Sequence, residues 1–102
     1  MERGLFHTRD SGGRHETTPA EYVEWAQKQA QERGVNFEGS PAAITRMIEK
    51  GLSVDGDIYL DYDVAGNILS RDGLNEMIKR AIGDETVTHV FIPRRDRLAR
   101  PD

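Results

Sequence analysis

The chain has 102 residues, a net charge of −4 and no cysteine. This length allows one domain with a modest core, and the absence of cysteine excludes disulfide frameworks, thiol nucleophiles and Cys/His zinc sites. Hydrophobic residues make up 36% of the chain and charged residues 31%, which is too apolar for a disordered tail and too polar for a membrane protein. We therefore expect one cytoplasmic domain over residues 1–102.

The first part of the chain predicts a strand followed by a helix. Residues 4–8 form a short apolar run, and the turn sequence of residues 9–13 ends it. Residues 18–21 form a capping box with proline at the first helical position, and apolar residues repeat at helical spacing from there to Gly34. This pattern predicts a helix over residues 19–33.

The second part predicts helix, strand, helix and strand. Ser40 and the proline after it repeat the helix-start signal, and Gly51 ends this shorter helix. Residues 57–63 alternate with a period of two, which indicates a strand. A third helix is expected over roughly residues 71–82, and residues 87–92 form an apolar run typical of a buried central strand. The third helix is expected to have one apolar side, made of Leu74, Met77, Ile78, Ala81 and Ile82.

Strands that alternate with helices indicate an α/β domain with a mainly parallel β-sheet and flanking helices. In such sheets ligands bind beyond the carboxyl ends of the strands. Three clusters follow the predicted strands, at residues 9–11, 66–71 and 94–100. If the strands are parallel, we expect these clusters to converge at one edge of the sheet.

The chain is acidic with a basic end. Residues 94–102 contain four arginines and two aspartates, a local charge of +2, so residues 1–93 carry −6. This distribution predicts a focused anion site rather than a broad basic surface.

Ser11 is the candidate nucleophile, because two glycines follow it and leave its hydroxyl exposed on a turn. A serine hydroxyl needs activation. A hydrolase triad is disfavoured because the sequence lacks the first glycine of the Gly-x-Ser-x-Gly elbow. Guanidinium groups provide another route, since they bind phosphate oxygens and stabilise the charge of a phosphoryl-transfer transition state. The candidate arginines are Arg9, Arg71, Arg97 and Arg100.

Three segments together resemble the catalytic domain of serine site-specific recombinases of the resolvase/invertase family. Arg9-Asp10-Ser11 resembles the Arg-x-Ser motif that opens these enzymes. Gly66 followed by Ser70-Arg71-Asp72-Gly73-Leu74 resembles the middle block of the family. Asp96-Arg97-Leu98-Ala99-Arg100 resembles its Asp-Arg-Leu-x-Arg signature, the most specific of the three. The motifs occur in the order of the family, and the resemblance covers most of the chain apart from roughly residues 35–56.

The resemblance implies that Ser11 cleaves and rejoins double-stranded DNA through a covalent 5′-phosphoserine intermediate. It implies that Arg9, Arg71, Arg97 and Arg100 contact the scissile phosphate and that Asp96 orients the arginines. The family uses no metal or nucleotide cofactor, and it acts as a dimer on each crossover site and as a tetramer during strand exchange. The dimerisation helix and DNA-binding domain of the family are not expected within these 102 residues, so this fragment alone is expected to be inactive.

The sequence also departs from the family. Residues 36–56 are an insertion expected to carry the second helix, and His15 and Tyr22 lie where the family has glutamines. The acidic residue before Gly66 is either Asp61 or Asp63. Two alternatives therefore stay open: a non-catalytic recombinase-like module that binds DNA or a partner, and a generic α/β phosphate-binding domain.

A calcium loop is disfavoured. Residues 61–72 match several positions of an EF-hand loop, but the fifth is Ala65 and the twelfth is Asp72 instead of glutamate. A strand rather than a helix is expected before this segment.

Overall fold

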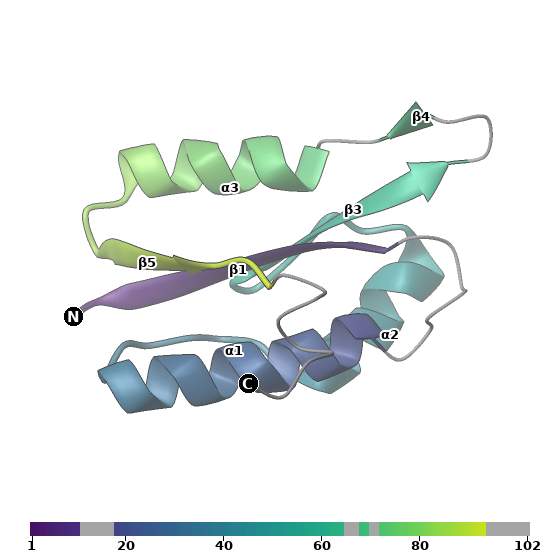
Figure 1. The fold of residues 1–102 in the computed structure, drawn as a ribbon. Coiled ribbons are helices and arrows are strands. Elements are labelled where there is room, and N and C mark those ends of the chain that lie inside the picture. The colour runs from purple at the N-terminus through teal and green to yellow at the C-terminus, as the bar shows by residue number, and fades with distance from the viewer. Residues whose placement is uncertain (11–17, 65–67, 70–71, 94–102) are drawn as a thin grey trace.

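The computed structural model describes residues 1–10, 18–64, 68–69 and 72–93, and these residues form three layers (Figure 1). Helices α1 and α2 cover one face of a sheet and helix α3 covers the other. The elements in chain order are β1 (Arg3–Asp10), α1 (Thr18–Arg33), α2 (Pro41–Lys50), β2 (Val54–Asp55), β3 (Ile58–Val64), β4 (Ile68–Leu69), α3 (Asp72–Gly83) and β5 (Val87–Phe91). None of the described helices is long and apolar enough to cross a membrane.

The central strands of the sheet are parallel. The order is β2-β3-β1-β5, and β1 runs parallel to both β3 and β5. The short strands β2 and β4 pair with β3 in the antiparallel direction. The α/β class and the mainly parallel sheet are thus confirmed, and the three long strands point their carboxyl ends toward one edge. The two antiparallel strands were not predicted.

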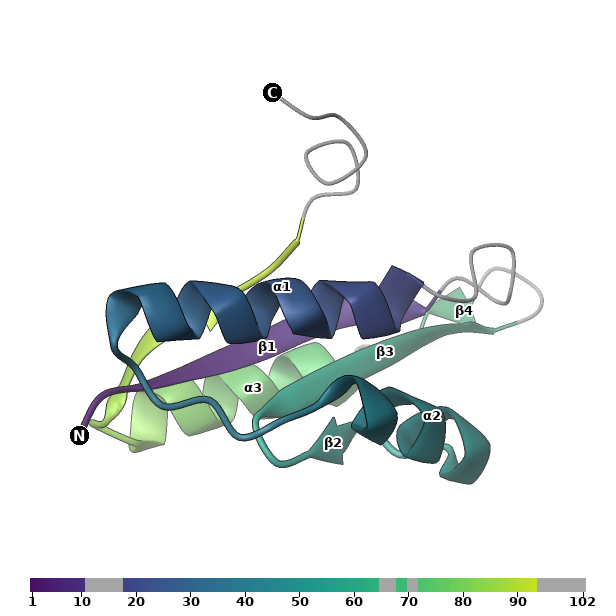
Figure 2. The same ribbon diagram turned by 90° about the horizontal axis from the view of Figure 1, so that it is seen from below.

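The larger part of the core lies between the sheet and the helices α1 and α2, which Figure 2 shows in front of the sheet. Helix α1 contributes Val23 and Ala26, which are completely buried because they lie on the apolar face that the sequence pattern predicts. Aromatic rings close one end of this core: Phe37 and Trp25 both make edge-to-face contacts with Phe91. The smaller core, on the other face, joins Leu5, Tyr59 and Met77 under α3.

Helix α2 confirms the expected helix inside residues 36–56. Ser40 is its N-cap, with extended backbone and no side-chain capping hydrogen bond, and proline follows. Gly51 ends the helix in the left-handed conformation with φ of 67°, where its N–H reaches the last carbonyl groups. Glycine adopts this conformation without the steric cost that a Cβ atom adds.

One expectation about burial was wrong, and one helix face is only partly covered. Strand β5 lies at the edge of the described sheet rather than in its centre, and Val90 is 47% exposed. On α3, Met77 is buried but Ile82 is 81% exposed, so the apolar side of this helix is only partly covered. An apolar run shows that a strand can be buried, whereas its place in the sheet depends on which strands pair with it.

Candidate functional site

The carboxyl ends of β1 and β3 lie side by side. Their parallel register runs from Phe6 opposite Ile58 to Asp10 opposite Tyr62, and it sets Arg9 opposite Asp61. Side chains alternate between the two faces of a strand, so Arg9 shares a face with His7 and Leu5. Leu5 packs under α3, and this face is therefore the one that α3 covers.

Asp61 links this edge of the sheet to the first turn of α3. Its carboxylate is buried and accepts hydrogen bonds from the backbone N–H groups of Gly73 at 2.7 Å and Leu74 at 3.1 Å. These groups have no partner within the helix, and a negative charge near them is favourable. Asp61 thus acts as a helix cap supplied from the neighbouring strand.

His7 completes this arrangement. Its Nε2 atom donates to Oδ2 of Asp61 at 2.8 Å, and the exposed fractions of the two side chains are 13% and 4%. We call His7, Asp61 and the two amides of Gly73 and Leu74 the carboxyl-edge network. The sequence left the direction of His7 open, and the structure turns it toward α3.

Gly73 allows α3 to approach β3 at this point. A Cβ atom at residue 73 would lie 2.7 Å from the carbonyl oxygen of Leu60 and 2.9 Å from its backbone nitrogen. Backbone atoms of a central strand cannot move aside cheaply. The glycine of the Arg-x-Gly-Leu segment is therefore needed for the contact between helix and strand.

We expect Gly73→Ala to lower the free energy of unfolding by about 1–3 kcal/mol, the usual cost of forcing extra atoms into a packed site. Gly83→Ala is the matched control, because it lies at the other end of α3 and its Cβ would meet nothing within 4 Å. Urea unfolding followed by fluorescence measures both variants. Equal stability of the two variants would contradict the close approach.

Among the predicted site residues, Arg9 lies on β1 at this edge with its side chain exposed. Ser11, Arg71, Asp96, Arg97 and Arg100 lie outside the described residues. The described chain nevertheless reaches the neighbours of two of them: β1 ends at Asp10 and α3 begins at Asp72.

The two candidates for the acidic position occupy different places. Asp61 belongs to the carboxyl-edge network, and the Cα atom of Asp63 pairs with that of Leu69 on β4. The side chain of Asp63 lies outside the described part of the structure. Asp61 therefore has a defined structural role at the start of α3.

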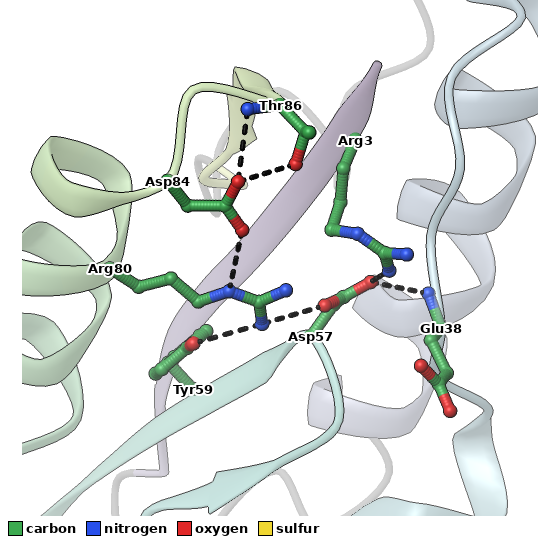
Figure 3. Close-up of polar contacts among 7 residues, drawn as sticks. All are labelled: Arg3, Glu38, Asp57, Tyr59, Arg80, Asp84 and Thr86. Carbon is green, nitrogen blue, oxygen red and sulfur yellow. Dashed lines mark hydrogen bonds and ion pairs between the residues drawn. The ribbon is translucent and has the colours of Figure 1, made fainter. Parts of the chain in front are cut away.

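A second polar cluster lies at the opposite edge of the sheet (Figure 3). Asp57 is 1% exposed and accepts from Arg3 Nη1 at 2.6 Å, from Arg80 Nη1 at 2.9 Å and from the backbone N–H of Glu38 at 2.7 Å. We call Arg3, Asp57 and Arg80 the amino-edge cluster. It joins β1, α3 and the segment before α2 around one carboxylate, and we assign it a structural role.

Tyr59 and Asp84 extend the amino-edge cluster, since both contact Arg80. The hydrogen bond and electrostatic interaction with Tyr59, and then those with Asp57, raise the pKa of Arg80. Hydrogen bonds from the Thr86 hydroxyl and backbone, followed by the charge of Arg80, lower the pKa of Asp84. Arg80 and Asp84 are both charged at neutral pH. The buried side-chain polar atoms of the described residues all have hydrogen-bond partners.

Within the described ranges, no three histidine, aspartate or glutamate side chains are grouped to hold a metal ion. At the carboxyl edge, the Asp61 oxygens already accept from two amides and one imidazole. Among the described residues, the group that this edge presents is therefore the exposed Arg9 side chain, on the strand next to Asp61.

Comparison with protein-family models, curated proteins and solved structures finds no match to this chain.

Proposed function

We propose that this chain is the catalytic domain of a serine site-specific recombinase, with a resolvase-like fold, that cleaves and rejoins double-stranded DNA. The carboxyl-edge network is the observation that carries the proposal. Arg9, two residues before Ser11, is in register with Asp61, and Asp61 holds the helix turn that directly follows Arg71. The described residues next to Ser11 and Arg71 thus lie at one edge, where α/β sheets bind their ligands, and this supports the proposal.

In the proposed reaction, the Oγ atom of Ser11 attacks the phosphorus of a DNA phosphodiester. The new Oγ–P bond forms as the bond from phosphorus to the 3′ oxygen breaks. The serine hydroxyl loses its proton to solvent, and the 3′ oxygen leaves with a proton as a free hydroxyl group. Rejoining reverses these steps, because the phosphoserine bond retains the energy of the phosphodiester.

The arginines supply the electrostatic part of this reaction. Guanidinium groups remain charged and pair with phosphate oxygens in a bidentate manner, so they stabilise the extra charge of the transition state. Arg9, Arg71, Arg97 and Arg100 are assigned this role, and Asp96 orients them. The domain acts without a cofactor, as a dimer on each crossover site and as a tetramer during exchange.

One observation disfavours a generic phosphate-binding domain. Such domains use the free amides of a helix N-terminus to bind the anion. In α3 the amides of Gly73 and Leu74 donate to the carboxylate of Asp61, which would also repel a phosphate. The first turn of α3 therefore does not offer these two amides to an anion.

Covalent capture tests the proposal. The full-length protein is mixed with duplexes that it selects from a randomised pool, and the reaction is stopped in denaturant. We expect an adduct of protein and DNA that survives denaturation. Duplex binding without an adduct would favour the non-catalytic module. Competition by small phosphorylated compounds, with no dependence on a duplex, would favour the generic phosphate-binding domain.

A further inference from the structure

We propose that His7 and Asp61 are positioning residues for this reaction, which makes the inference dependent on the proposed function. Their hydrogen bond joins β1 to the first turn of α3. It thereby fixes Arg9, which lies on the same face of β1, relative to the first turn of α3, which begins one residue after Arg71 in the sequence.

The way in which Asp61 uses its two oxygens supports a positioning role. Oδ1 accepts from Gly73 N, while Oδ2 accepts from both Leu74 N and His7 Nε2. A buried carboxylate with both oxygens occupied is a poor acceptor for a proton from a reacting group. Asp61 therefore acts through the helix that it holds and does not serve as a general base.

Capping alone does not explain His7. The two amides of α3 are satisfied by Asp61, and an apolar side chain at residue 7 would continue the core that Leu5 and Met77 form on this face. Replacing both members of a buried ion pair by well-packed apolar groups is often neutral or stabilising, so stability alone does not explain why His7 is paired with Asp61. The bond from His7 instead fixes the direction of the carboxylate, and it occurs at the edge where the proposed chemistry takes place.

Asp57, the buried aspartate that directly precedes β3, shows the contrast. Asp57 and Asp61 both lie on the α3 side of the chain, and both connect β1 with α3. Asp57 connects them at the amino edge through arginines, away from the motif segments. A variant at the amino edge therefore disturbs the same interface without touching the proposed site.

The test compares His7→Leu, which removes the hydrogen bond, with His7→Gln, which restores an N–H donor. Tyr59→Phe is the matched control, since Tyr59 lies on β3 and its hydroxyl contacts Arg80 of α3 at the amino edge. In the full-length protein, we expect His7→Leu to slow formation of the Ser11-dependent DNA adduct by roughly 10–100-fold, the range expected when a reacting group is misplaced by up to 1 Å.

DNA binding is expected to change little in His7→Leu. The rates are compared at a temperature at which thermal unfolding shows every variant to be folded, which separates positioning from folding. We expect His7→Gln to recover the rate to within a few-fold, and Tyr59→Phe to resemble the wild type. An unchanged rate in His7→Leu would overturn the inference. A rate in His7→Gln as low as in His7→Leu would overturn it as well.

Amide hydrogen exchange tests the geometric part without DNA. In His7→Leu, the N–H groups of Gly73 and Leu74 are expected to exchange about fivefold faster than in the wild type, because loss of one hydrogen bond of about 1 kcal/mol loosens the cap. The amide of Met77, further along α3, is expected to keep its rate. Unchanged exchange at Gly73 and Leu74 would show that His7 does not hold the helix start.

The two measurements separate the two possible failures. Absence of any adduct in the wild type would overturn the proposed function. It would also overturn the inference that His7 and Asp61 position groups for catalysis. Faster exchange at Gly73 in His7→Leu would still support the link between β1 and α3. A wild-type adduct combined with unchanged rates in both His7 variants would leave the proposed function standing and overturn this inference alone.

Discussion

Ser11→Ala in the full-length protein is expected to abolish formation of the DNA adduct, a loss of at least about 10³-fold, as for removal of other catalytic nucleophiles. The reason is chemical: alanine has no oxygen with which to form the bond to phosphorus. DNA binding is expected to persist, because the arginine side chains remain and supply the attraction for phosphate. Gel analysis of denatured reactions measures the adduct, and a filter-binding titration measures the affinity for duplex DNA.

Ser40→Ala is the matched control for that experiment. Ser40 precedes α2, and its side chain makes no capping hydrogen bond, so removal of its oxygen leaves the fold and the proposed site intact. The control is expected to form the adduct at the wild-type rate. Persistent adduct formation by Ser11→Ala would refute the assignment of the nucleophile.

Asp57→Ala is expected to have the largest effect on stability, a loss of about 3 kcal/mol. This is the lower end of the cost of breaking a buried ion pair, because Arg3 and Arg80 stay partly exposed to solvent. Arg3 and Arg80 would face each other without the negative charge between them, and the N–H of Glu38 would lose its acceptor. This is a large part of the 5–15 kcal/mol typical of folded domains.

Urea unfolding measures this loss. Trp25 is the single tryptophan, and its ring contacts Phe91, so its fluorescence reports on the larger core. Asp55→Ala is the control, since the pair of Asp55 with Arg46 is more exposed and is expected to contribute about 0–1 kcal/mol. Equal midpoints for the two variants would contradict the structural role of the amino-edge cluster.

The helices were predictable because their signals are local. The capping sequence before α1, the Ser-Pro pair before α2 and the left-handed Gly51 after it each act within a few residues. Such signals determine where a helix begins and ends without reference to the rest of the fold.

The sheet was predictable only in part, because pairing depends on distant residues. The period of two over β3 indicated a strand, but it did not reveal that Asp57, Tyr59 and Asp61 on the α3 side are buried as deeply as the apolar residues. The two-residue strands β2 and β4 are too short to produce a pattern. The edge position of β5 likewise follows from pairing and not from its composition.

The candidate site divides in the same way. The motifs predicted which residue types follow the ends of the strands. The sequence analysis expected these residues to converge if the strands are parallel, and β1, β3 and β5 are parallel. The carboxyl-edge network had no sequence signal, because His7 and Asp61 are 54 residues apart and meet only through the register of two strands. Their pairing became visible once that register was known.

Peptide mapping of the captured adduct tests the central claim most directly. Trypsin cleaves after Arg9 and after Arg14, and the peptide between these sites carries Ser11 as its single hydroxyl residue. After nuclease digestion of the DNA, mass spectrometry is expected to find a nucleotide on the peptide of residues 10–14. We expect this nucleotide to be attached through its 5′ phosphate. A nucleotide attached to any other peptide, or a 3′ linkage at Ser11, would contradict the account.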